Sequence, residues 1–295
     1  MFQDELLKGK RILVTGGGTG LGRVIAEKYL SLGADIYICG RRGNVLEETS
    51  AEMMAEHGGT VKFKAVDIRD ADAVDAMVGE IFDDGGPLTG LVNNAAGNFI
   101  SRTEDLSHRG FDAIADIVMH GTFYVTHSVG RRWIEAGVPG SVVSILVTWV
   151  FNGGPYVVPS AMSKSAIRSL TQSLALEWGQ HDIRLNAIAP GEFPTEGMSA
   201  RLLPGMKSGR ADDNPMRRVG RMPELQNLAT FLMADGVDWI NGQTITIDGG
   251  QWMAGGGNFF RFRDKTDEDW NNIRDLIKAQ NAKDKAQRTV DPAKA

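Results

Sequence analysis

The sequence predicts an α/β fold: a doubly wound, Rossmann-like parallel sheet of about seven strands in a single domain, with a helical tail at the C-terminus. Three observations favour it. Short apolar runs of strand length alternate with longer segments whose apolar residues recur at helical spacing. The first apolar run leads directly into a glycine-rich turn that opens a helix. No linker and no repeat of fixed period interrupts residues 1–250.

Each expected strand is a short run of aliphatic and β-branched residues that ends at glycine or a polar residue. The seven runs are 11–15, 35–39, 61–68, 88–93, 140–147, 183–189 and 244–247. Such continuously apolar strands are typical of a parallel sheet with helices on both faces.

Helices are expected between these strands because apolar residues recur every three or four positions. The ranges are 21–32, 44–57, about 107–136, 160–179 and 223–234. Asn44 with Glu47 three residues later predicts the start of the second helix, and Asp70 predicts the cap of a helix after the third strand.

Residues 251–295 differ in character, so we expect two parts, 1–250 and a C-terminal extension, 251–295. Thr266 and Asp269 predict the start of a helix with the apolar stripe Trp270, Ile273 and Ile277. The polar last dozen residues are expected to be disordered.

Composition excludes several classes of protein. Of 295 residues 42% are hydrophobic, enough for a large core, and the net charge of −5 argues against a nucleic-acid partner. The single cysteine, Cys39, excludes a disulfide framework, and the histidines lack metal-site spacing. With no signal-peptide pattern and no membrane-length apolar run, we expect a soluble, cytoplasmic protein without a metal.

The glycine-rich turn after the first strand predicts a phosphate-binding loop. Gly16, Gly20 and Gly22 give the spacing G-x-x-x-G-x-G in a strand–turn–helix context. Glycines let the backbone approach a pyrophosphate, and the helix N-terminus supplies free N–H groups. The candidate residues are Gly16, Gly18, Thr19, Gly20 and Leu21. The alternative is a tight turn without a ligand.

Arg41 and Arg42 follow the second strand. An NAD site favours an acidic residue here, whereas two arginines suit a 2′-phosphate through charge-assisted hydrogen bonds. NADP(H) is therefore the predicted cofactor. The alternative is a pair of solvated arginines.

Four features occur in the order of one known family. They are the turn 15–22, the segment Asn93-Asn94-Ala95-Ala96-Gly97, Lys164 early in a long helix, and Pro190-Gly191 after the sixth strand. Over residues 8–250 the chain resembles the short-chain dehydrogenase/reductase family. The resemblance implies that a cofactor is held by Asp67, Ile68, Asn94, Ala95, Lys164, Pro190, Gly191 and Phe193.

A narrower resemblance covers nearly the whole chain. Residues 93–101, 121–123, 157–161 and 171–178, and the tail with its Trp270 helix, are similar to the mitochondrial-type 2,4-dienoyl-CoA reductases. It implies an NADPH-dependent reduction of an acyl-CoA in the β-oxidation of unsaturated fatty acids, and a homotetramer. These enzymes also have a serine four positions before the lysine, where Ser160 stands.

Ser160 is too weak an acid to replace the tyrosine that carbonyl reductases keep at this position. Reduction of a conjugated thioester does not need that acid, because charge collects on the thioester oxygen as a dienolate and needs only hydrogen-bond donors. The resemblance implies Asn98 as one donor. Trp149 stands where the family has the second, a tyrosine, and is either an N–H donor or a wall of the pocket. Tyr156 is a third candidate.

The resemblance also implies five substrate contacts: Arg69, Phe99, Ser107, Tyr156 and Arg201. For each, the alternative is a plain surface or core role. The loop 191–222 is expected to cover the acyl chain. His120 is a candidate proton relay toward Lys164, or a structural histidine.

The predicted function is reduction of a 2,4-dienoyl-CoA. The alternatives are a trans-2-enoyl-CoA reductase, a 3-oxoacyl or alcohol dehydrogenase of the same family, and a sensor that binds NADP(H) without turnover.

Overall fold

The computed structural model describes residues 1–195, 214–254, 262 and 264–286. The chain divides into two compact units, Met1–Trp252 and Met253–Ala295. The substrate loop predicted at 191–222 is described at its two ends only, and Arg201 lies outside the described residues.

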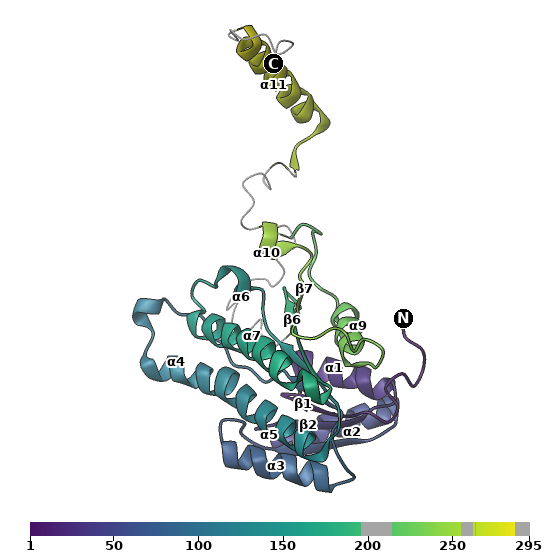
Figure 1. The fold of residues 1–295 in the computed structure, drawn as a ribbon. Helices are drawn as coiled ribbons and strands as arrows, with labels where there is room; N and C mark the ends of the chain where they lie inside the picture. The colour runs from purple at the N-terminus through teal and green to yellow at the C-terminus, as the bar shows by residue number, and fades with distance from the viewer. Residues whose placement is uncertain (196–213, 255–261, 263, 287–295) are drawn as a thin grey trace. The chain divides into compact units, whose positions relative to one another are not determined.

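The first unit is built on one parallel sheet of seven strands in the order β3-β2-β1-β4-β5-β6-β7 (Figure 1). Every neighbouring pair of strands is parallel. The strands are β1 Arg11–Thr15, β2 Asp35–Gly40, β3 Val61–Ala65, β4 Gly90–Asn93, β5 Gly140–Ile145, β6 Ile183–Pro190 and β7 Thr244–Ile247. The predicted fold class is confirmed.

Helices cover both faces of the sheet. The longer ones are α1 Gly20–Ser31, α2 Gly43–His57, α3 Ala71–Asp83, α4 His108–Ala115, α5 Gly121–Ala136, α7 Val158–Trp178 and α9 Met222–Met233. One apolar core lies between the sheet and α1, α2 and α9, and a second between the sheet and α3, α5 and α7 (Figure 1). Strand residues alternate between the two cores: Ile12 and Val14 belong to the first, Leu13 to the second.

One predicted helix detail is wrong. Asn44 does not cap α2, because the helix already begins at Gly43 with Arg42 as its N-cap. The long helical stretch expected over about 107–136 is confirmed as α4 and α5, which a π-helical turn, Asp116–His120, joins without a break. The predicted cap Asp70 is confirmed, since its side chain accepts from the backbone N–H groups of residues 72 and 73.

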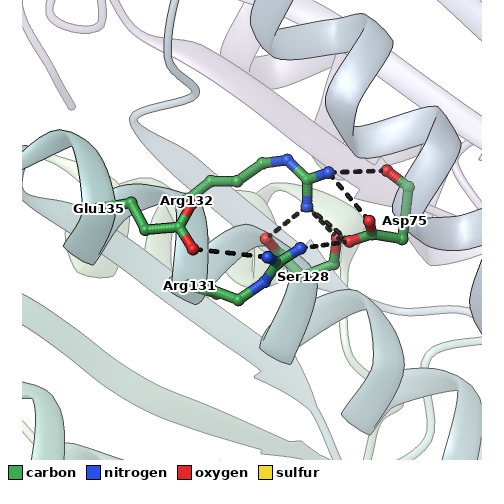
Figure 2. Close-up of polar contacts among 5 residues, drawn as sticks. All are labelled: Asp75, Ser128, Arg131, Arg132 and Glu135. Carbon is green, nitrogen blue, oxygen red and sulfur yellow. Dashed lines mark hydrogen bonds and ion pairs between the residues drawn. The ribbon is translucent and has the colours of Figure 1, made fainter.

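A polar cluster joins α3 to α5 (Figure 2). Asp75 on α3 accepts hydrogen bonds from Ser128 at 2.7 Å and from Arg132 Nη1 at 2.6 Å. Arg131 Nη2 reaches the same carboxylate at 3.0 Å and also contacts Glu135. Arg132, which donates hydrogen bonds to the carboxylate, lowers the pKa of Asp75 below its usual value.

The second unit contains the predicted tail helix, α11 Asp267–Ala286. Asp269 N–H donates to Thr266 Oγ1 at 3.2 Å, and Thr266 N–H donates to Asp269 Oδ2 at 3.0 Å, so the predicted capping pair is confirmed. Among the described helices of both units, none is long and apolar enough to cross a membrane.

Candidate active site

A cavity of about 1200 Å³ opens at the carboxyl ends of β1, β2, β3 and β4. From β1 the sheet grows in one direction through β2 and β3 and in the other through β4, so the cavity lies at the switch point where α/β sheets bind ligands. The predicted cofactor residues that line it are Gly16, Gly18, Thr19, Gly20, Leu21, Arg41, Arg42, Asp67, Ile68, Asn94 and Ala95.

The glycine turn is shaped by the loop after β4. Gly16 and Gly20 have positive φ angles of 65° and 58°, which glycine adopts without steric cost. Asn94 Nδ2 donates to the carbonyl of Thr15 at 3.1 Å, and a Cβ on Gly22 would lie only 2.4 Å from that nitrogen. The turn therefore needs glycine for close packing as well as for ligand approach.

The start of α1 suits an anionic ligand. Thr19 is the N-cap of α1, and its side chain makes no capping hydrogen bond to the described chain. The first N–H groups of the helix and its dipole thus face the cavity that Gly20 and Leu21 line. A cavity of this size with this phosphate cradle fits a dinucleotide.

Two exposed arginines lie at the end of β2. Arg41 and Arg42 both line the cavity, and Arg42 Nη2 lies 3.5 Å from Thr19 Oγ1. Neither forms an ion pair among the described residues. Arg23 lines the same region, but its guanidinium is occupied by Glu27 at 2.7 Å and Glu52 at 2.8 Å.

The side chains of Asp67 and Arg69 form an ion pair. Arg69 Nε lies 3.0 Å from both carboxylate oxygens of Asp67, and the arginine lowers the pKa of Asp67 below its usual value. Ile68 between them is buried against Gly121 at the start of α5. The structure therefore pairs a predicted cofactor residue with a predicted substrate residue.

Lys164 is buried on α7 at 8% exposure, and its ammonium group donates to the carbonyl of Ile145 at the end of β5. Burial lowers its pKa from 10.5 to about 8. Ser160, also buried, lies one helical turn earlier. No tyrosine occupies that turn, as the sequence shows.

Asn98 and Trp149 follow the ends of neighbouring strands. β4 ends at Asn93 and β5 at Ile145, and the two strands are paired in parallel, so both residues lie beyond the same sheet edge. Asn98 lines the cavity, and its Oδ1 accepts from Phe99 N–H at 2.9 Å. The Asn98 amide nitrogen is thereby left as the donor group of that side chain.

Trp149 begins a single helical turn, α6 Trp149–Asn152. It is half-buried, and its ring lies against Gly154, where a Cβ would come within 3.1 Å. Trp149 does not line the large cavity.

Tyr156 has the backbone angle φ 65°, a left-handed conformation that costs a non-glycine residue energy, and its side chain is 60% exposed. Its carbonyl accepts from Ser101 N–H at 2.9 Å, which ties the loop after β5 to the loop after β4.

Phe99 and Ser107 have local partners. The Phe99 ring packs near Gly110, and Ser107 Oγ caps α4 by accepting from Gly110 N–H at 3.1 Å. Their predicted substrate contacts remain predictions.

Four predicted cofactor residues do not line the large cavity: Lys164, Pro190, Gly191 and Phe193. Pro190 ends β6, and Gly191 packs so tightly on Asp248 that a Cβ would lie 2.6 Å away. Phe193 is buried and lines a second cavity of about 240 Å³.

His120 ends the π-helical turn, and its Nδ1 lies 3.2 Å from Asp116 Oδ1. The proton relay toward Lys164 predicted for His120 stays a prediction. Within the described ranges, no group of three acidic, histidine or cysteine side chains is placed to hold a metal ion.

The arrangement matches known proteins. A family model described as enoyl-(acyl carrier protein) reductase matches residues 16–251. A crystal structure of a short-chain dehydrogenase from Bacillus anthracis superimposes with a TM-score of 0.75 at 36% identity, covering 83% of this chain and 97% of that one.

The chain belongs to the short-chain dehydrogenase/reductase family.

Two further members of the family bear on function. A Caenorhabditis elegans protein named probable 2,4-dienoyl-CoA reductase 3, (3E)-enoyl-CoA-producing, is 39% identical over 97% of this chain and 94% of its own length. A gluconate 5-dehydrogenase from Burkholderia cenocepacia, solved in complex with NADP and tartrate, has a TM-score of 0.77 at 28% identity, with 84% of this chain and 97% of that one covered.

Sequence reasoning missed part of the cavity wall in this family member. Val45 and Leu46 come from the first turn of α2, Ile117 from the π-helical turn, and Thr195 from the segment after β6. Thr195 lies against Gly20, which brings the two ends of the cavity wall together across 175 residues of sequence. Only the apolar Val45-Leu46 pair, directly after the arginines, offered a sequence signal.

Proposed function

We propose that the protein uses NADPH to reduce a conjugated acyl-CoA thioester, with a 2,4-dienoyl-CoA from the β-oxidation of unsaturated fatty acids as substrate. One observation carries the proposal: a buried serine, Ser160, occupies the helical turn before Lys164, while neutral N–H donors follow the ends of β4 and β5. The name of the Caenorhabditis elegans relative supports the same substrate class.

Cofactor choice follows from the end of β2. Arg41 and Arg42 are exposed on the cavity wall and form no salt bridge within the described part of the chain, which favours a ligand with an extra phosphate. The NADP complex of the Burkholderia relative is consistent with this choice. When bound, NADPH supplies the hydride.

Each residue has a defined task in the proposed reaction. As the hydride arrives at a carbon remote from the carbonyl, negative charge grows on the thioester oxygen. The amide of Asn98 and the indole N–H of Trp149 donate hydrogen bonds to that oxygen. Lys164 holds the nicotinamide ribose. Because the final proton goes to carbon from water, Ser160 does not have to act as an acid.

The test compares three substrates whose reduction differs in whether an acid must protonate an oxygen. The oxidation of NADPH is followed by absorbance with hexadienoyl-CoA, a 2-enoyl-CoA with an otherwise saturated chain, and a 3-ketoacyl-CoA. We expect the dienoyl thioester to be reduced fastest. Faster turnover of the 2-enoyl thioester would favour an enoyl-CoA reductase, and faster turnover of the ketone would overturn the proposal. Tight NADPH binding without oxidation would indicate a sensor.

A further inference from the structure

Trp149 belongs to α6, a helical turn too short to be stable through its own backbone hydrogen bonds. α6 is one turn of four residues, held by backbone contacts such as Phe151 N–H to Thr148 O at 3.1 Å and Gly153 N–H to Trp149 O at 2.9 Å. Isolated helices this short do not persist in water, so side-chain packing must fix α6.

Val150 and Phe151 both pack on the apolar cluster that includes Leu146 and Ile167, and Phe151 makes two further ring contacts. The Phe151 ring stacks on Trp252 with the ring centroids 4.8 Å apart and the planes 24° apart. The guanidinium of Arg168, on α7, lies 4.8 Å from the centroid of the same Phe151 ring. We call Phe151, Trp252 and Arg168 the 151–252 stack.

The contact of Arg168 with the Phe151 ring offsets a cost of burial. Its Nε atom is buried and has no hydrogen-bond partner in the part of the chain that the structure describes. A buried guanidinium nitrogen without such a partner is costly, which makes the contact with the Phe151 ring the compensating interaction.

Trp252 is itself anchored. Its backbone N–H donates to Asp248 Oδ2 at 2.8 Å, and the other carboxylate oxygen of Asp248 accepts from the backbone N–H of Gly250 at 2.9 Å. Asp248 also packs on Gly191, directly after β6. The 151–252 stack thus connects the end of β6, through Asp248, to the turn that carries Trp149.

We propose that the 151–252 stack is a positioning unit: it fixes α6 and so sets where the Trp149 indole meets the thioester. Phe151, Trp252 and Arg168 act through Trp149 and do not touch the reacting atoms. The inference rests on the proposed function only where it names the thioester as the group that Trp149 meets; the fixing of α6 stands on the packing alone.

The test measures α6 directly and turnover separately. Hydrogen exchange of the peptide spanning residues 147–153 is followed by mass spectrometry in the full-length, ligand-free protein. Phe151→Leu and Trp252→Leu are expected to raise its exchange rate on the order of tenfold, since one aromatic pair and one cation–π contact are lost. Arg168→Gln, a milder change, should raise it less.

Kinetic measurements then distinguish a positioning role of the stack from a general loss of structure. With hexadienoyl-CoA, Phe151→Leu and Trp252→Leu should lower kcat about as much as they raise exchange, while the Kd for NADPH stays unchanged. Trp252→Phe should restore both quantities. Trp239→Leu is the matched control, because that indole is fully exposed and should leave both quantities unchanged.

The outcomes distinguish the two proposals. If the variants exchange faster but the wild type reduces no thioester, the proposed function is wrong and the positioning unit is still supported. If the wild type reduces the thioester and the exchange of 147–153 is the same in every variant, the positioning unit is wrong. If NADPH binding weakens together with the fall in kcat, the stack has only a general structural role and the inference also fails.

Discussion

Lys164 is a candidate site residue whose acid–base chemistry the fold alters. Its pKa falls from 10.5 to about 8 because the ammonium group is buried. Between pH 8 and 10.5 the unfolded chain keeps this proton while the folded protein has released it, so the free energy of unfolding rises with pH across that window. Below pH 8 both states hold the proton and the folded state carries the cost of a buried charge.

We therefore expect the free energy of unfolding of the wild type, from urea titrations at pH 8 and pH 10, to rise relative to that of Lys164→Met. Other titrating groups are common to both proteins and cancel in the comparison. Parallel pH profiles would mean that Lys164 titrates at its ordinary pKa.

Asn98 is predicted to act on turnover rather than on cofactor binding. Asn98→Ala removes a hydrogen-bond donor for the growing oxyanion, and losing one such donor lowers kcat by roughly 10²–10³-fold. The Kd for NADPH, measured by fluorescence titration, should be unchanged. A kcat within a few-fold of wild type would remove Asn98 from the mechanism.

Trp149→Tyr tests whether an N–H donor replaces a hydroxyl donor. Both side chains donate a hydrogen bond, so dienoyl-CoA reduction should be maintained or raised. Trp149→Phe keeps an aromatic wall without a donor and should reduce kcat. Equal activity of the two variants would assign Trp149 a packing role.

At the scale of elements, the polar cluster that joins α3 to α5 depends on one carboxylate, that of Asp75 (Figure 2). Asp75→Asn should lower the free energy of unfolding by about 1–2 kcal/mol at pH 7, a modest value because Asp75 is half-exposed and its charge is screened. Since its pKa is lowered, the stabilisation is fully present above the ordinary value of 3.8 and is lost progressively as the pH falls below 3.8 toward the lower pKa of the folded state.

Thermal melts at pH 7 and pH 3 measure this effect. The difference between wild type and Asp75→Asn should shrink at the lower pH. Glu135→Gln is the control, because its pair with Arg131 is exposed on both sides and should contribute less than about 0.5 kcal/mol. Equal effects of the two substitutions would show that the cluster adds nothing beyond a surface pair.

For the whole molecule, the homotetramer remains a prediction. Leu176 on α7 is 88% exposed, which an apolar side chain in a subunit interface would explain. Sedimentation analysis should give a mass about four times that of one chain, and Leu176→Asp should shift the protein to smaller species. A monomeric wild type would contradict the prediction.

The sequence predicted the sheet and most of the cavity well because both depend on local patterns. Apolar runs locate the strands, and the glycine turn and Arg41-Arg42 directly follow two of them. Features that depend on distant partners were not predictable. No local pattern tells that Thr195 will reach Gly20, or that Trp252 will stack on Phe151, 101 positions earlier.

The π-helical turn Asp116–His120 has a consequence for how this chain tolerates length changes. Ile114 and Ile117, before and within the turn, both pack on Gly97, next to Asn98. A π-helical turn holds one residue more than the α-helical turn it replaces, so deleting one residue here would favour regular α-helix and keep the faces of α4 and α5 in place. The same deletion within α4 or α5 would instead rotate one side of the helix by about 100°. A one-codon deletion near Met119 should therefore be the better tolerated, with its effect confined to the packing of Ile114 and Ile117 on Gly97.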